Sequence, residues 1–158
     1  MRRVSRASVR AASVLLSCAL AAVATPRAIA DAPPGRYTIA GATSATVTDG
    51  KTGLTWLRDV ITPPLNTLES ATKACPSGYR LPDIKELATL VDESASGLPY
   101  LDSKAFPKVS AVTLWSSTMS NASATDYQSF VMHPDGTTER VYYNGSGTTD
   151  LKVLCVSP

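Results

Sequence analysis

The sequence predicts an α+β domain in which two amphipathic helices in the first half combine with short antiparallel strands and long loops. Apolar residues recur at helical spacing between positions 66 and 92. Short β-prone runs are separated by turn dipeptides such as Asp135-Gly136 and Asn144-Gly145. A length of 158 residues suits one domain. Strands and helices that are segregated along the chain are typical of the α+β class.

The first thirty residues have the organisation of a secretory signal peptide. A basic stretch from Met1 to Arg10 precedes an uncharged run from Ala11 to Ala24, and the small-x-small triplet Ala28-Ile29-Ala30 follows. We therefore expect cleavage after Ala30 and a secreted or periplasmic product. An uncleaved anchor helix and lipidation at Cys18 are the alternatives, but the apolar run is short for a hydrocarbon core of ~30 Å.

The remainder is expected to hold a leader over residues 31–45 and a single domain over residues 46–158, with no membrane contact after signal removal. The signal region contains five arginines and no acidic residue. Without it the chain keeps ten basic and thirteen acidic residues, which gives a net charge of −3. A nucleic-acid partner is therefore not expected, because a phosphate backbone requires a basic surface.

The strands before the helices are predicted from β-prone runs. Tyr37 to Ile39 is the first of these runs. Thr46–Thr48 and Leu54–Leu57 flank the turn sequence Asp49–Gly53, and two such runs around Asp-Gly predict a β-hairpin.

Two helices follow, each with a capping residue. Asn66 is the predicted N-cap of a helix over 67–75, with Glu69 completing a capping box. Asp83 and Glu86 form the same pattern at the start of the second helix. Behind Asp83, apolar residues at helical spacing predict a face turned toward the core: Ile84, Leu87, Leu90 and Val91.

The second half of the chain is predicted to be a long loop followed by strands. Residues 93–112 contain prolines and small residues, which favour an ordered loop with one helical turn near 102–106. Four β-prone segments then complete the sheet, over residues 114–118, 127–132, 137–143 and 151–156.

Two cysteines, Cys75 and Cys155, remain after signal removal. An even number in an oxidising compartment predicts a structural disulfide. A metal site and a redox pair are the alternatives; a metal requires more ligands nearby, and a redox pair usually has C-x-x-C spacing.

The sequence shows no catalytic constellation, so we expect neither an enzyme nor a cofactor. His133 lies in a turn, where a solvated side chain is the simplest interpretation. A Ser-His-Asp set drawn from Ser116 or Ser117 with His133 lacks the G-x-S-x-G motif. No metal ligand is assigned. A calcium site is the alternative for four carboxylates that match no calcium-loop pattern: Asp126, Asp135, Glu139 and Asp150.

The aromatic residues are the candidates for ligand binding. Trp115, like Trp56, belongs either in the core or on the surface as a platform for a sugar ring. Tyr100, Tyr142 and Tyr143 are further candidates for the same role. Tyr142 and Tyr143 are adjacent, so on a strand one of them must face outward.

Five ordered blocks of the chain resemble the Lcl C-terminal domain family, which is named after a collagen-like bacterial adhesin. The resemblance covers about residues 46–157. The blocks are Val47–Trp56, Gly78–Asp92 with its Arg-Leu-Pro-x-x-x-Glu-Leu core, Phe106-Pro107, Leu114–Thr118 and Val153–Val156.

The resemblance implies a compact fold akin to C-type lectins and sulfatase-modifying factors, with two helices and a twisted antiparallel sheet. It implies that Cys75 and Cys155 are bridged. It also implies a structural polar link between Arg80 and Glu86, at the start of the helix that Asp83 caps. The adhesin itself is trimeric and binds sulfated glycosaminoglycans, whereas the charge of −3 favours a neutral or weakly charged ligand here.

These observations favour a secreted, non-enzymatic binding or adhesion module for a glycan or a cell-surface protein. The alternative is a structural or accessory domain that acts through protein contacts. An enzyme related to formylglycine-generating factors is the weakest hypothesis, because that chemistry requires reactive cysteines. The sequence leaves the oligomeric state open.

Overall fold

The computed structural model describes residues 32–41, 45–93, 98, 100–109, 111–120, 128–142 and 150–158. The predicted signal peptide and its cleavage site lie outside the described residues. Within those ranges no helix is long and apolar enough to span a membrane. The elements in chain order are β1 (Tyr37–Ile39), β2 (Thr46–Asp49), β3 (Thr55–Leu57), α1 (Leu68–Ala74), α2 (Ile84–Thr89), β4 (Leu114–Ser120), β5 (Gln128–Met132), β6 (Thr138–Tyr142) and β7 (Val156–Ser157).

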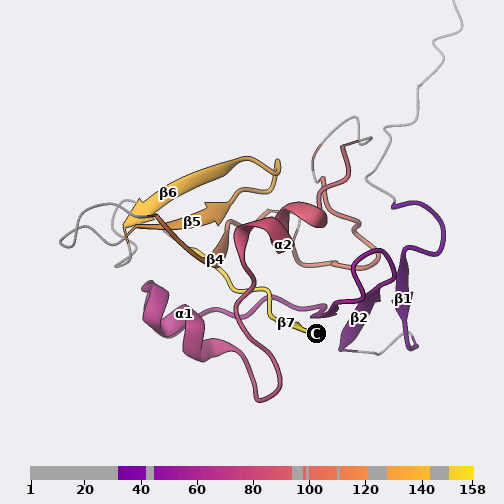
Figure 1. Ribbon diagram of the computed structural model, residues 1–158, viewed down its shortest axis with the longest axis horizontal. Coiled ribbons are helices and arrows are strands. Elements are labelled where there is room, and N and C mark those ends of the chain that lie inside the picture. The colour runs from indigo at the N-terminus through magenta and orange to yellow at the C-terminus, as the bar shows by residue number, and fades with distance from the viewer. Residues whose placement is uncertain are drawn as a thin grey trace, which may run out of the picture.

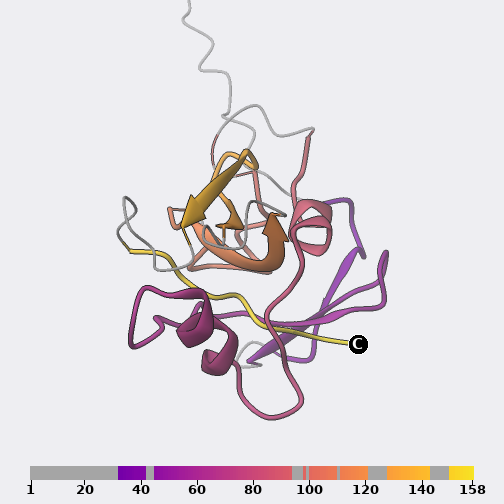
Figure 2. The ribbon, with the colours of Figure 1, turned by 60° about the vertical axis from the view of Figure 1, so that its left-hand side comes forward.

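The fold is α+β, as predicted, but its strands form two antiparallel sheets instead of one. One sheet has the order β1-β2-β3-β7 and the other has the order β4-β5-β6. The predicted last strand does not merge them, because residues 151–156 form single bridges to different partners. Val153 pairs with Ile61, and Lys152 pairs with Leu114. The C-terminal segment therefore runs between the two sheets, as both ribbon views show (Figures 1 and 2).

The predicted hairpin is confirmed. β2 and β3 pair antiparallel, with Val47 opposite Trp56 and Thr48 opposite Thr55. Gly53, in the turn, has a φ of +76°, a conformation that a side chain disfavours. The alternation along the hairpin buries Val47 and Trp56 almost completely. The hairpin therefore supplies one wall of the core.

The core consists of two clusters. The first lies around Trp56, Leu87 and Phe106, and the Trp56 and Phe106 rings meet edge to face at 6.5 Å. The second lies around Trp115 and Val131, and it includes Cys155 and Ala71 of α1. The first cluster draws on both sheets, since it combines Trp56 of β3 with Leu114 of β4 and Met132 of β5.

The N-cap of α1 is Thr67, so the prediction of Asn66 was wrong by one residue. Thr67 has extended backbone angles, and its hydroxyl oxygen accepts a hydrogen bond from the Ser70 amide at 3.1 Å. Glu69 does not close a capping box; its carboxylate binds Lys73 one turn further on, at 2.6 Å. Thr67 caps because it lies three residues before an amide that its hydroxyl can reach.

The capping box predicted for α2 is confirmed. Asp83 Oδ1 accepts from the Glu86 amide at 2.7 Å, and Glu86 Oε2 accepts from the Asp83 amide at 2.9 Å. Leu87 and Leu90 are buried, and Ile84 is partly buried against the same cluster. The Ile84 amide also donates to Thr118 Oγ1 of β4 at 2.9 Å, which fixes the start of the helix to the second sheet.

Candidate functional site

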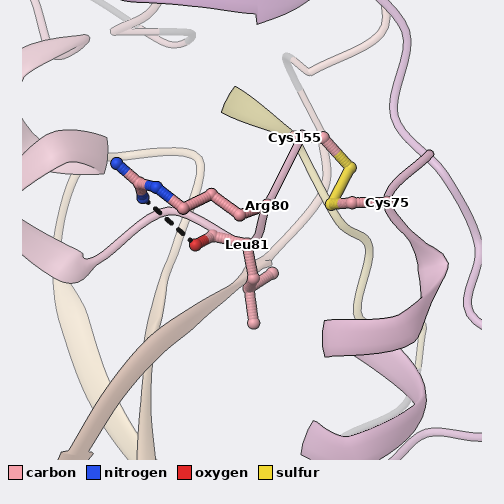
Figure 3. Close-up of a disulfide and its surroundings, with 4 residues drawn as sticks. All are labelled: Cys75, Arg80, Leu81 and Cys155. Atoms are coloured by element: carbon pink, nitrogen blue, oxygen red, sulfur yellow. Dashed lines mark hydrogen bonds between the residues drawn. A yellow bond between two sulfur atoms is a disulfide. The ribbon is translucent and has the colours of Figure 1, made fainter. Parts of the chain in front are cut away.

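The predicted disulfide is present between Cys75 and Cys155. Their Cα atoms are 5.7 Å apart across a sequence separation of 80 residues. The bond joins the end of α1 to the C-terminal segment just before β7 (Figure 3). Both sulfur atoms are in the bond, so neither is available as a metal ligand while it is intact.

Arg80 and Glu86 form the polar link that the family resemblance implied. Two guanidinium nitrogens of Arg80 donate to the two Glu86 carboxylate oxygens at 2.7 and 2.6 Å. The hydrogen bonds from Arg80 hold the pKa of Glu86 below its ordinary value, although partial burial opposes ionisation. Figure 3 shows the Arg80 side chain extending away from the disulfide, and its guanidinium also donates to the Leu81 carbonyl. Because Glu86 closes the capping box of α2 as well, the link is structural.

Four aromatic residues were candidates for ligand contact, and the structure separates them. Trp115 has no exposed surface, so its ring belongs to the core and offers no stacking face. Tyr100 is partly buried, and its carbonyl accepts from the Asp92 amide. Tyr143 lies outside the described residues. Tyr142 is 50% exposed and is the candidate that lies at the surface.

Tyr142 lies on β6, which is an edge strand of the second sheet. Thr138, Arg140 and Tyr142 are exposed, whereas Val141 turns into the core. Residues two apart on a strand point to the same side, so Arg140 and Tyr142 are neighbours on one face. The Arg140 guanidinium makes no hydrogen bond or ion pair within the part of the chain that the structure describes. This pair was only half identified from the sequence, which gave the tyrosine but not the arginine.

His133 is more constrained than a solvated turn residue. Its Nδ1 lies 3.2 Å from Thr113 Oγ1, and its Nε2 lies 2.9 Å from Glu139 Oε2. The hydroxyl of Ser116 donates to the Phe130 carbonyl, and that of Ser117 donates to the Pro82 carbonyl. The serine-based catalytic set considered from sequence is therefore not assembled.

The four carboxylates considered for calcium do not converge among the described residues. Asp135 accepts from the amide and hydroxyl of Thr137, and Asp150 pairs with Lys152. Asp126 lies outside the described residues. Within the described ranges no group of three or more histidine, cysteine or acidic side chains could hold a metal ion.

A buried ion pair that the sequence analysis missed lies at the edge of the first sheet. Asp49 has no exposed surface, and Arg36 donates to both of its carboxylate oxygens at 3.3 and 3.1 Å. The sequence gave Asp49 only a role in the turn. Arg36 directly precedes the predicted strand Tyr37–Ile39, and the sequence did not show that this strand would pair with β2 and so bring Arg36 to Asp49.

An α+β domain closed by one disulfide, with an exposed tyrosine on the edge strand β6, is the class that this geometry defines. The model of the Lcl C-terminal domain family matches residues 45–157, and the chain belongs to that family. No curated protein and no solved structure matches the chain. The lectin-like character of the fold therefore stays a prediction.

Proposed function

We propose that this protein is a secreted, non-enzymatic binding module of the adhesion type, which recognises a carbohydrate or another cell-surface ligand. Membership of the Lcl C-terminal domain family supports a domain of this kind. A disulfide supports an oxidising compartment outside the cytoplasm. Because both cysteines are bonded, the thiol chemistry of formylglycine-generating factors has no support here.

The observation that carries this proposal is the Arg140–Tyr142 pair on β6. A half-exposed tyrosine presents an apolar ring face and a polar hydroxyl, which together suit the mixed surface of a sugar. The adjacent guanidinium supplies several fixed donors for hydroxyl or carboxyl oxygens. A pleated strand fixes the backbone of both residues, so the two side chains leave it on the same face of the sheet.

The charges of the surface favour a neutral or weakly charged ligand. Firm binding of a sulfated polysaccharide requires many unpaired cations in one patch. Several cations here already pair with a carboxylate, namely Arg36, Lys73, Arg80, Lys108 and Lys152. We therefore expect little retention on heparin.

A glycan-array screen of the wild-type protein and of Tyr142→Ala, with and without calcium, tests the proposal. We expect wild-type binding to a neutral or weakly charged glycan, and a loss of at least about tenfold in Tyr142→Ala, since stacking and a hydroxyl contact disappear together. Thr138→Ala is the matched control, because Thr138 is exposed on the same strand. Equal binding by Tyr142→Ala and wild type would mean that the Arg140–Tyr142 pair does not contact the glycan.

A heparin column at low salt and neutral pH tests the charge of the ligand. We expect the protein to flow through. Firm retention that weakens steeply with added salt would instead indicate a polyanion ligand.

A structural or accessory role through protein contacts is the second candidate. Among the described residues no strand pairs with the outer edge of β6, and such an edge can add a strand from a partner. Met119 of β4, which is 47% exposed, also favours this role. A protein partner that binds equally well to wild type and Tyr142→Ala, with no glycan bound, would support this second role.

Export with cleavage after Ala30 completes the proposal. N-terminal sequencing of the secreted material is expected to begin at Asp31. A start at Cys18 would point to lipidation, and a start at Met1 would contradict export by a cleaved signal.

A further inference from the structure

The outer edge of β6 presents backbone groups in a fixed order. β5 and β6 pair antiparallel with no shift of register, and the His133 amide donates to the Thr137 carbonyl where the hairpin turns. Because hydrogen-bonded and non-hydrogen-bonded pairs alternate along an antiparallel ladder, the backbone groups of residues 137, 139 and 141 face β5. The backbone groups that point outward therefore belong to Thr138, Arg140 and Tyr142.

This edge lacks the usual protection against pairing. Within the part of the chain that the structure describes no strand pairs with it, and Figure 1 shows β6 on the outer side of β5. Natural edge strands are often blocked by a proline, a lysine or a bulge. The strand Thr138–Tyr142 contains no proline, lysine or bulge, and its one carboxylate, Glu139, already lies 2.9 Å from His133 Nε2. The edge can therefore accept an antiparallel strand.

Arg140 and Tyr142 complement each other across such an edge. Both are exposed, and the tyrosine exposes half of its surface. A guanidinium is attracted to the face of a tyrosine ring when it lies within about 6 Å of the ring centroid. Directly opposed residues of antiparallel strands have Cβ atoms about 4.5–5.5 Å apart, which is within reach of this contact. A second β6 strand supplies the same two residues in reverse order, so β6 is complementary to its own copy.

Backbone geometry and charge select one register for two β6 strands. The outward backbone groups of one strand must meet those of the other, so the two-fold axis passes through a residue and not between two residues. Three positions of the axis pair at least three residues of each β6. An axis at Arg140 opposes two guanidinium groups, and an axis at Glu139 opposes two carboxylates, so both are unfavourable. An axis at Val141 places each Arg140 opposite the partner's Tyr142 and opposes no like charges among these residues.

We infer that two copies of this protein associate through their β6 edges about a two-fold axis at Val141, which joins their β4-β5-β6 sheets into one. Each Arg140 exchanges backbone hydrogen bonds with the partner's Tyr142, and its guanidinium lies against that ring. The shared edge is short, so the association is weak and depends on concentration. The inference does not rest on ligand binding: a monomer that binds a glycan would overturn the dimer alone, and a dimer that binds none would overturn the proposed function alone.

Sedimentation equilibrium of the purified, oxidised protein without any ligand tests the association. The protein is loaded at concentrations from about 10 μM to about 1 mM, the range in which weak complexes form. We expect the average mass to rise from that of the monomer toward that of the dimer and no further, because a two-fold contact uses both β6 edges. A monomer at every concentration would overturn the inference, and so would a mass that grows beyond the dimer.

A charge exchange on β6 tests the register. Tyr142→Lys places an ammonium group opposite the partner's Arg140, so we expect the dimer to weaken by at least about tenfold. Combining it with Arg140→Glu opposes unlike charges and should restore association. With an axis at Arg140 the same double variant would oppose two carboxylates, so restored association identifies the axis at Val141.

Thr138→Lys is the matched control, because it adds the same charge to the same strand at a position that faces no β6 residue of the partner in this register. It should associate as the wild type does. A double variant that stays monomeric, or a loss in Thr138→Lys as large as that in Tyr142→Lys, would overturn the register. Circular dichroism checks that each variant is folded; if one is not, the concentration series on the wild type still decides whether the dimer forms.

Discussion

Arg36 and Asp49 show at the residue scale how a buried charge is maintained. Burial disfavours the ionised form of Asp49, but hydrogen bonds from Arg36 and from the Lys51 amide outweigh it, so its pKa is lowered. Arg36 also donates to the Thr89 carbonyl at the end of α2, and its side chain is only 10% exposed. One guanidinium therefore connects the N-terminal segment, the hairpin and the second helix.

Arg36→Ala is expected to lower the free energy of unfolding by about 3–5 kcal/mol, because a fully buried carboxylate would lose its counter-charge. Urea denaturation followed by circular dichroism measures the change. Lys73→Ala is the control, since the Lys73–Glu69 pair is exposed, and its stability should equal that of the wild type. A loss below about 1 kcal/mol for Arg36→Ala would mean that the buried pair does not form.

Two carboxylates that accept hydrogen bonds from arginine, Asp49 and Glu86, predict that the protein loses stability in acid. The pKa values of Asp49 and Glu86 lie below their ordinary 3.8 and 4.5. The unfolded chain then binds more protons than the folded chain in this range, so stability is fully present above about pH 5 and falls as the pH drops through those values. Glu86→Gln should flatten the pH dependence of the free energy of unfolding between about pH 5 and 3. Identical slopes in wild type and variant would contradict this coupling.

At the scale of elements, α2 organises the first core cluster. Its capping box satisfies backbone donors at the start, and its apolar face contributes Leu87 with no exposed surface. A helix of six residues has little intrinsic stability, so its packing must hold it.

Leu87→Ala is therefore expected to cost about 2–5 kcal/mol, through lost apolar contact and the cavity that remains. Thermal and urea unfolding measure the loss. Lys85→Ala on the exposed side of the same helix is the control and should change stability by less than about 0.5 kcal/mol. Equal effects of the two substitutions would show that the helix does not pack as described.

At the scale of the whole molecule, the C-terminal segment holds the two sheets together. It pairs with β3 through β7, bridges Ile61 and Leu114, and carries Cys155 in the second cluster. The disulfide attaches this segment to α1 and closes a long loop.

Cys155→Ser and Cys75→Ser should each lower the free energy of unfolding by about 2–5 kcal/mol relative to the wild type. In each variant the unfolded chain regains the conformational freedom that the bond removes. Non-reducing mass spectrometry is expected to show one bond and no free thiol in the secreted protein. The double variant should be no less stable than either single variant, since both remove the same bond. A much larger loss in the double variant would place the cysteines in separate interactions.

The sequence by itself determined the features that depend on neighbouring residues. The Asp83–Glu86 capping box, the hairpin around Asp49–Gly53 and the core face of α2 all follow from spacings of a few residues, which fix local backbone geometry. The cysteine pair followed as well, because two cysteines allow one internal bond. For Tyr142 and Tyr143 the sequence predicted only that one of the two rings faces outward. Side chains alternate along any strand, but which side faces the core depends on how the strand packs.

Tertiary structure alone decided the features that join distant segments. The division into two sheets depends on where residues 151–156 meet Ile61 and Leu114, and no local pattern encodes such partners. The burial of Trp115 and the Arg36–Asp49 pair arise in the same way, because burial depends on which elements pack together and not on the residue's own type. The local sequence around a strand tryptophan is the same whether its ring is buried or exposed to solvent. Only the packing of the folded chain distinguishes the two cases.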